Sequence, residues 1–298
     1  MSSEFAIDWY TMLMKMKYID THAHLNLSAF DNDVDEVALR CAEEGVQVIN
    51  IGTKLSTSKK AVELAEKYEH LYAMVGLHPI QTTPERHSEE EIGGKAFVSK
   101  GEVFDMEVYR ELASNKKVVG IGECGFDYFH NGVDTYEAQE TAFLQQIELA
   151  NELQLPLMIH TRDPKPGEKS PTGRSVYDDV YDILKKHLKV SANIHFYAGS
   201  LPQAQKFFEL GCTISFTGVI TFAKDYEEVV RNAPLERIHG ETDCPYVAPV
   251  PHRGKRCEPT MVQEVYKKIA EIKRMDEEEV RVQLLENAKR LYKGSFIC

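Results

Sequence analysis

The sequence predicts a single-domain α/β protein built as a closed (β/α)8 barrel, also called a TIM barrel. Eight apolar, strand-like runs alternate with helical patterns along 298 residues, and this alternation favours parallel strands with right-handed crossovers. No change in composition marks a second domain, and barrels of this kind commonly use this much chain. Five of the eight runs lead into residues that can bind a divalent cation. A closed barrel brings those five ends around one mouth, whereas a doubly wound open sheet would spread them along a line.

The elements follow from the spacing of apolar residues. Short apolar runs predict strands at 17–21, 46–51, 71–75, 118–121, 155–159, 190–194, 212–216 and 237–242. Apolar residues three and four apart predict helices at 31–44, 56–69, 106–114, 135–153, 175–187, 202–210, 225–231, 259–273 and 277–292. Residues 81–101 and 163–173 read as polar connections. We expect residues 1–16 to form a loose N-terminal extension and residues 17–293 to form the barrel domain.

Ligand-type side chains lie at the ends of five predicted strands. The five runs stop at His22 and His24, at Glu123, at His160, at His195 and at Asp243. We expect the strand before Glu123 to end there and Gly125 to turn the chain away. A buried carboxylate is costly unless a cation meets it. An arginine or lysine partner for Glu123 is the alternative to a metal ion.

The number and type of these side chains favour a two-metal site. His22 and His24 are two residues apart in an extended segment, so both imidazoles point to the same side. Six ligands, four histidines and two carboxylates, exceed the three protein ligands that one catalytic zinc usually has. Two divalent ions that share Glu123 account for the number better. Because no cysteine belongs to the set, Zn²⁺, Mn²⁺ or Mg²⁺ is expected rather than a soft metal.

Composition limits the partners and the compartment. A net charge of −12 disfavours non-specific wrapping of nucleic acid, but it allows DNA to enter a cleft transiently as a substrate. Six cysteines without a CxxC pair suit a reducing compartment. The sequence shows neither a secretory signal nor a run of membrane-spanning length. We therefore expect a cytoplasmic or nuclear protein with no membrane contact and no obligate protein partner.

Several sequence blocks together resemble the signature of a known family. The blocks are His22-Ala23-His24-Leu25, Gly76-Leu77-His78-Pro79, Gly120-Ile121-Gly122-Glu123-Cys124-Gly125-Phe126-Asp127, Ile159-His160-Thr161-Arg162-Asp163 and Glu241-Thr242-Asp243-Cys244-Pro245-Tyr246. In this order they are similar to the TatD-type deoxyribonucleases, metal-dependent hydrolases of the amidohydrolase superfamily. The resemblance covers about residues 17–293 and itself implies a TIM barrel. This sequence differs from the usual family pattern at two places, Phe196-Tyr197-Ala198 and Cys257, and neither place contains a predicted ligand.

The resemblance also implies how the ligands are shared between two ions. His22, His24, Glu123 and Asp243 would hold one ion, and Glu123, His160 and His195 the other. Candidate substrate-binding residues are His78, Arg162, Arg253, Lys255 and Arg256. For His78 a structural cap is an equal alternative. Arg162 can instead brace its loop through a salt bridge, and the cluster at 252–256 can be a solvated surface.

The resulting hypothesis is a two-metal hydrolase of phosphodiester bonds, a deoxyribonuclease that acts on DNA ends or single strands. Glu123 and Asp243 are the candidate catalytic residues, with Glu123 between the ions and Asp243 as the acceptor of a proton from water. One alternative is an amide or ester hydrolase, including one for aminoacyl-tRNA, because the same metal pair can attack a carbonyl. A second alternative is a barrel that serves only as a binding module.

Overall fold

The computed structural model describes residues 16–84, 86–87, 97–98, 100–130 and 135–292. Eight parallel strands form one sheet in the order β1-β2-β3-β6-β7-β8-β9-β10. Their bounds are β1 Tyr18–Ala23, β2 Val46–Ile51, β3 Leu71–Val75, β6 Val118–Asp127, β7 Leu157–Arg162, β8 Ala192–Ile194, β9 Thr213–Phe216 and β10 Ile238–Gly240. Two further strands of two residues each, β4 Arg86–His87 and β5 Phe97–Val98, pair antiparallel. This small hairpin lies in the stretch expected to be a polar connection.

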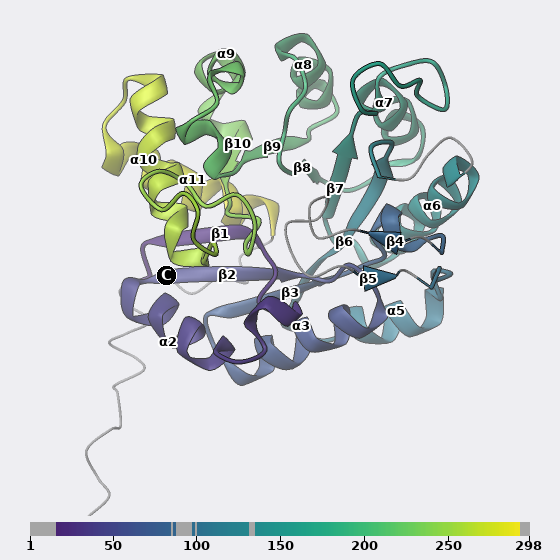
Figure 1. Ribbon diagram of the computed structural model, residues 1–298, viewed down its shortest axis with the longest axis horizontal. Helices are drawn as coiled ribbons and strands as arrows, with labels where there is room; N and C mark the ends of the chain where they lie inside the picture. Colours follow the sequence, from purple (N-terminus) through teal and green to yellow (C-terminus); the bar gives the residue numbers. More distant parts are fainter. Residues whose placement is uncertain (1–15, 85, 88–96, 99, 131–134, 293–298) are drawn as a thin grey trace, which may run out of the picture.

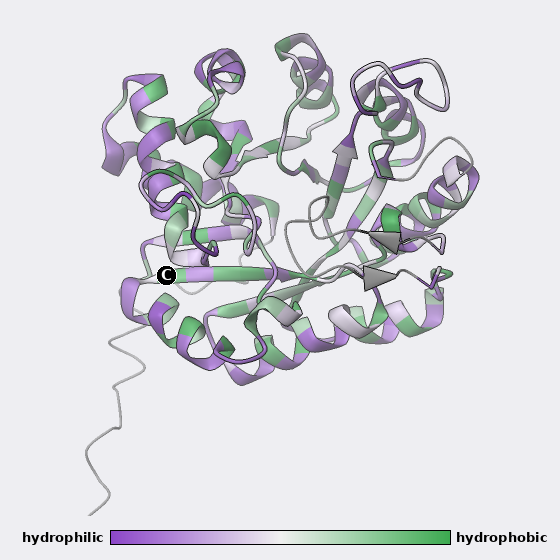
Figure 2. Ribbon diagram, viewed as in Figure 1, coloured by the Kyte–Doolittle hydropathy of each residue, from purple (hydrophilic) through white to green (hydrophobic). Residues whose placement is uncertain are grey.

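Helices connect the strands and form an outer layer around them (Figure 1). They are α2 Val34–Glu44, α3 Leu55–Lys67, α5 Met106–Ala113, α6 Tyr136–Leu153, α7 Val176–His187, α8 Leu201–Glu209, α9 Glu227–Asn232, α10 Val262–Lys273 and α11 Glu277–Leu291. Each carries both hydrophobic and hydrophilic residues (Figure 2), as expected for helices that bury one side against a sheet. None of the helices in the described part of the chain combines the length and the apolar character that crossing a membrane would need.

The sheet closes between its first and last strands. Ala23, at the end of β1, forms a parallel bridge with Cys244. The His24 amide donates to the Cys244 carbonyl at 3.0 Å, and the Asp243 amide donates to the His22 carbonyl at 2.9 Å. These contacts join the two edges at the carboxyl ends of the strands and confirm the predicted barrel. They also fix the backbone of three predicted metal ligands.

Two groups of buried apolar residues hold the barrel together. The larger one lies between the strands and the helices. The smaller one fills the barrel interior and consists of Ile19, Ile49, Ile51, Tyr72, Met74, Val119, Met158, Ala288, Leu291 and Tyr292. In β2 and β3, alternate residues belong to the two groups, as the two-residue period of a strand requires. Because the last turns of α11 belong to the inner group, this helix packs against the interior of the barrel.

The prediction for the strand that carries Glu123 was wrong in its end point. β6 runs on through Glu123 to Asp127, and it stays paired with β7 from Cys124 onward. Gly125 has φ 133°, and a Cβ there would lie 2.2 Å from the carbonyl oxygen of His160. This glycine therefore allows a close approach of two strands and does not turn the chain away. The pairing of β6 with β7 shifts register between Ile121 and Cys124, so the irregularity in the ladder includes the position of Glu123.

Most helix starts lie within one residue of the predictions, and the differences of two or three residues occur where a 3-10 turn comes first. Residues 28–30, 224–226 and 259–261 form such turns before α2, α9 and α10. α2 ends at Gly45, whose φ of 73° is the left-handed conformation that commonly closes a helix. The proposed extension at residues 1–16 lies almost wholly outside the described residues, and its separation from the domain at 17–293 stays a prediction.

Candidate metal centre

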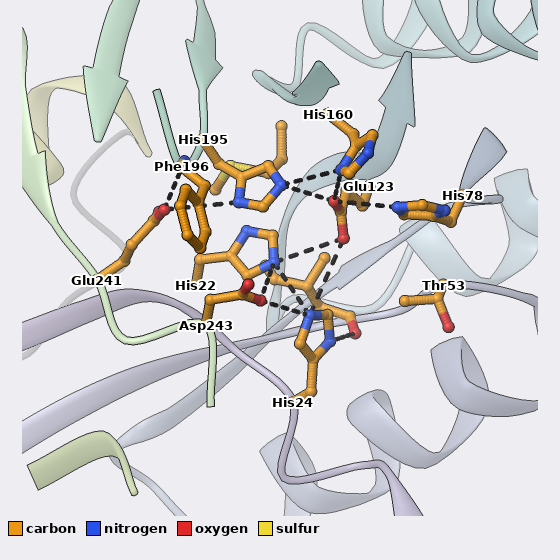
Figure 3. A network of polar contacts seen from close by, with 12 residues as sticks. His22, His24, Thr53, His78, Glu123, His160, His195, Phe196, Glu241 and Asp243 are labelled. Atoms are coloured by element: carbon orange, nitrogen blue, oxygen red, sulfur yellow. Dashed lines mark hydrogen bonds and ion pairs between the residues drawn. The ribbon is translucent and has the colours of Figure 1, made fainter. Parts of the chain in front are cut away.

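All six predicted metal ligands converge at the carboxyl ends of the barrel strands. His22 lies in β1 and His24 directly follows it, Glu123 lies in β6, and His160 lies in β7. His195 directly follows β8, and Asp243 lies three residues beyond the end of β10. Figure 3 shows the histidines and Asp243 arranged around the carboxylate of Glu123. The barrel closure thus brings together side chains that are up to 221 residues apart in the sequence, counting from His22 to Asp243.

One half of the centre consists of His22, His24 and Asp243. The Nε2 atoms of His22 and His24 lie 3.1 Å apart. Asp243 Oδ1 lies 3.6 Å from His22 Nε2 and 3.3 Å from His24 Nε2. Glu123 Oε2 faces the same two nitrogens at 3.5 and 3.9 Å. Four ligand-type atoms therefore point into one small volume.

The other half consists of His160 and His195 with the second oxygen of Glu123. Oε1 of Glu123 lies 2.8 Å from His160 Nδ1 and 2.6 Å from His195 Nε2. The two nitrogens lie 3.3 Å from one another. Each oxygen of Glu123 thus faces a different half of the centre.

These separations fit divalent ions. Tetrahedral zinc with bonds of about 2.0–2.1 Å separates neighbouring ligand atoms by roughly 3.3 Å. The nitrogen–nitrogen and nitrogen–oxygen distances in each half, from 2.6 to 3.9 Å, lie around that value. Nitrogen and carboxylate oxygen donors suit Zn²⁺ and Mn²⁺. The side chains present can therefore hold metal, and two carboxylates with four imidazoles can hold two ions.

Burial and charge strongly perturb the ionisable groups. Burial by itself raises the pKa of Glu123, but His195, His78 and His22 outweigh burial and hold that pKa well below its usual range. Burial by itself lowers the pKa of His195, but Glu123 and then Glu241 raise it well above 6.5. Glu123 and His195 thus stabilise each other's charged forms.

Contacts behind the ligands fix which ring nitrogen faces the centre. His24 Nδ1 lies 3.0 Å from the Ile51 carbonyl, so this nitrogen donates and Nε2 is free to bind metal. His160 is oriented the other way. Its Nε2 lies 3.0 Å from Asp127 Oδ2, which leaves Nδ1 facing Glu123. Asp127 is fully buried and also accepts from the His130 ring at 2.8 Å.

His78 differs from the predicted ligands in its protonation. Its Nδ1 accepts a hydrogen bond from the Ile80 amide at 3.1 Å, so in the neutral ring the proton is on Nε2. Nε2 lies 3.4 Å from Glu123 Oε1. Burial and the neighbouring His160 lower the pKa of His78 to about 4, despite the opposing effect of Glu123. The structural cap expected as one alternative is therefore present, and the other ring nitrogen presents an N–H to the centre. Contact of His78 with a substrate stays a prediction.

One predicted ligand, Asp243, and one residue next to a predicted ligand, Phe196, have an unusual backbone conformation. Asp243 has φ 54° and Phe196 has φ 44°, both in the left-handed region. Such conformations cost of order 1–3 kcal/mol for residues other than glycine. Hydrogen bonds hold both, since the Asp243 carbonyl accepts from Tyr246 and the Phe196 amide donates to Glu241 Oε1 at 2.7 Å. The fold thus maintains strain directly at the centre.

Two of the predicted substrate-binding arginines stack on aromatic rings. The Arg162 guanidinium lies over the Phe129 ring, 4.3 Å from its centroid, and Arg253 lies over Phe222 at 3.9 Å. Arg253 and Lys255 are exposed. The role of these residues in substrate binding stays a prediction.

Arg256 has ionic partners within the fold. It forms ion pairs with Asp33 at 2.5 Å and Glu258 at 2.9 Å. It also donates to the Ala29 carbonyl. A variant that removes all three cations of the cluster would therefore disturb these contacts as well as any substrate contact.

Sequence reasoning missed Asp127, His130 and Glu241. The first and last could have been found from the strand period, because Asp127 lies four residues after Glu123 and Glu241 lies two before Asp243. Residues two and four apart in an extended segment point to the same side. No sequence pattern connects His130 to His160 through Asp127.

Comparison with known proteins agrees with this arrangement. Residues 19–293 match a family model described as TatD related DNase. The chain is 37% identical to YabD of Bacillus subtilis, named as an uncharacterized metal-dependent hydrolase, over 92% of this chain and 98% of that protein. It is 29% identical to YcfH of Escherichia coli K12, described in the same way, over 93% and 96% of the two chains. The crystal structure of YjjV, a TatD homologue from Escherichia coli K12, superposes with a TM-score of 0.77 at 28% identity, over 94% of this chain and 99% of that one.

Proposed function

The chain belongs to the family of TatD-related DNases and is a metal-dependent hydrolase, and from that premise we propose that it uses two divalent ions to hydrolyse phosphodiester bonds in DNA. DNA ends or single strands are the proposed substrates. The observation that carries the proposal is the position of Glu123, whose two oxygens face two separate sets of ligands. A carboxylate placed in this way is suited to bridge two ions, which lie about 3.5–4 Å apart in two-metal sites.

Charge balance supports two ions. Four buried or half-buried carboxyl groups surround the centre, those of Glu123, Asp127, Glu241 and Asp243. Charges that are removed from water need compensation. Two divalent ions and four carboxylates together are neutral when the histidine ligands are neutral. One ion would leave two negative charges uncompensated in a largely buried site.

The bound ions would activate water and polarise the phosphoryl group. The chain's own residues supply the remaining steps. Asp243 is the proposed acceptor of the proton from the attacking water, because its side chain is 15% exposed while those of Glu123 and Glu241 are 3% and 0% exposed. His78 presents Nε2–H beside Glu123 and is suited to donate to a phosphoryl oxygen. Both side chains point to the same centre, where the substrate phosphate would enter.

A panel of substrates tests the proposal. The metal-free protein is loaded with Zn²⁺ or Mn²⁺, and the number of bound ions is measured by elemental analysis. Hydrolysis is then compared on single-stranded DNA, duplex DNA, RNA and aminoacyl esters. We expect two ions per chain and metal-dependent release of nucleotides from DNA. An Asp243→Asn variant purified in parallel controls for contaminating nucleases.

The panel also separates the competing functions. Cleavage of aminoacyl esters with no cleavage of DNA would overturn the phosphodiester assignment and leave the metal centre intact. Saturation at one ion or fewer would overturn the shared role of Glu123. A loaded protein that binds DNA without cleaving any substrate of the panel would overturn the proposed reaction.

A further inference from the structure

A second carboxylate lies behind the metal centre, on the opposite side of two histidine rings from Glu123. The rings of His22 and His195 stack at 3.9 Å with an interplanar angle of 11°. Their Nε2 atoms face Glu123. Figure 3 shows Glu241 on the other side of this stacked pair, beside Phe196. One histidine belongs to each half of the centre, so Glu241 is adjacent to both halves.

Three buried polar atoms without hydrogen-bond partners among the described residues lie in Glu241, His22 and His195. Glu241 is fully buried, and its Oε2 has no hydrogen-bond partner among the described residues. Nδ1 of His22 and Nδ1 of His195 are also buried, and neither has a hydrogen-bond partner within the part of the chain that the structure describes. Ligand-type atoms of the three residues all lie within 4.8 Å of one another. Glu241 Oε1 lies 3.5 Å from His195 Nδ1. Buried polar groups without partners are rare, and three in one place need an explanation.

Metal binding supplies that explanation, given the proposed two-ion centre on which this inference rests. A neutral imidazole that binds a cation through Nε2 carries its proton on Nδ1. His22 and His195 would then both have an Nδ1–H that points away from the metal into a region without solvent. Each N–H needs an acceptor. Glu241 Oε1 lies 3.5 Å from His195 Nδ1, and a carboxylate oxygen of Glu241 lies within 4.8 Å of a ring nitrogen of His22.

We propose that Glu241 is a positioning residue shared by the two metal ions, and that it accepts hydrogen bonds from the Nδ1–H groups of His22 and His195. It thereby orients one ligand of each ion from behind. Asp127 has the corresponding role for His160 alone. Asp127 thus supports one ion, whereas Glu241 supports both and couples their binding.

Metal titration of matched variants tests this role without relying on activity. Glu241→Gln keeps the size of the side chain and an oxygen that can accept from the Phe196 amide, but it places an NH₂ group where a second acceptor is needed. We expect it to lower the affinity for both ions by about 10–100-fold. Asp127→Asn is the control and should lower the affinity for one ion only. Both affinities are read from the visible absorption of Co²⁺ during titration.

Histidine tautomers provide a second measurement. In ¹⁵N-histidine spectra of the zinc-loaded protein, two Nδ1–H signals from His22 and His195 should show strong hydrogen bonding. Glu241→Gln should shift both, and Asp127→Asn should shift neither. Thermal unfolding of the metal-free variants shows whether they fold.

Unchanged signals and unchanged affinities in a folded Glu241→Gln protein would mean that Glu241 holds only the Phe196 backbone, and the inference would be overturned. The wild-type titration separates this failure from that of the proposed function. A wild-type protein that binds fewer than two ions contradicts the two-ion centre itself.

Discussion

Glu123 is the residue on which the two halves of the centre depend, because each of its oxygens faces different ligands. Glu123→Gln preserves the shape of the side chain but removes the charge that draws two cations together. We expect activity to fall at least ~100-fold, since changes around metal ligands already cost about 10–100-fold. The number of bound ions should fall below two. Near wild-type turnover at saturating metal would show that Glu123 is not the bridge.

His78 can be separated experimentally from the proposed metal ligands. His78→Asn retains an acceptor for the Ile80 amide, because asparagine also caps turns well, but it cannot place an N–H near Glu123. We expect kcat to fall ~100-fold or more, as the loss of one catalytic hydrogen-bond donor does elsewhere. Two ions should still bind. In contrast, His160→Ala should lose one ion, and loss of an ion in His78→Asn would make His78 a ligand.

Gly125 connects the strand geometry to the position of His160. Gly125→Ala would place a methyl group 2.2 Å from the His160 carbonyl oxygen and force φ 133° on a residue with a Cβ. Gly173→Ala is a matched control, because Gly173 also has a positive φ, 75°, but open space around it. We expect Gly125→Ala to lower the free energy of unfolding by at least ~2 kcal/mol more than the control. Equal losses in chemical denaturation would show that the close approach does not matter.

The turn between α3 and β3 contains a histidine that should make stability depend on pH. His70 is buried, its Nε2 donates to the Ala38 carbonyl at 2.9 Å, and its Nδ1 has no hydrogen-bond partner among the described residues. Burial, and to a smaller extent Lys117, lower its pKa to about 4 against the opposing effects of the Ala38 carbonyl and Glu69. The unfolded chain therefore takes up this proton first as the pH falls. The contribution of His70 to stability is complete above pH 6.5 and is lost progressively between pH 6.5 and about 4.

Urea unfolding of wild-type protein and His70→Gln at several pH values measures this contribution. The shift corresponds to about 3 kcal/mol between the two limits. The glutamine variant can still donate to the Ala38 carbonyl but has no proton to gain. We expect its stability to depend less steeply on pH over this interval. Parallel curves for the two proteins would mean that His70 does not contribute.

Helices and strands were predictable where the spacing of apolar residues determines them. Their ends were less predictable where contacts with other parts of the chain determine them. The eight strands and the alternation with helices follow from apolar runs that are buried on both sides, such as Val46–Ile51. The end of β6 could not be predicted, because a glycine reads as a turn unless its neighbour across the sheet is known. At the site, the presence of ligand-type side chains at the strand ends was predictable from residue type. The tautomer of His78 depends on an amide two residues away. The buried, unpartnered atoms of Glu241 and His22 come together only in the closed barrel.

For the whole molecule, a net charge of −12 means that general attraction does not bring DNA to the protein. On the proposed function, local cations near the barrel mouth must then supply the attraction for DNA. Arg253 and Lys255 are exposed in the segment that follows Asp243. Arg253 donates through Nη1 to the Ala248 carbonyl, and its other N–H groups can meet phosphate. Arg256 is paired with Asp33 and Glu258, so its replacement should chiefly affect stability. The double variant Arg253→Ala with Lys255→Ala and the single variant Arg256→Ala thus form a matched pair.

We expect the double variant to raise KM for oligonucleotides much more than it lowers kcat. The loss should be largest at low salt, because each phosphate contact contributes to counterion release and its removal flattens the dependence of log KM on log salt. Arg256→Ala should leave that slope unchanged and lower the unfolding midpoint. Hydrolysis of a small neutral ester, where it occurs, should be unaffected in the double variant because the metal ligands are intact. If the double variant and Arg256→Ala show the same salt slope as wild type, phosphate recognition must come from Arg162, His78 and the ions.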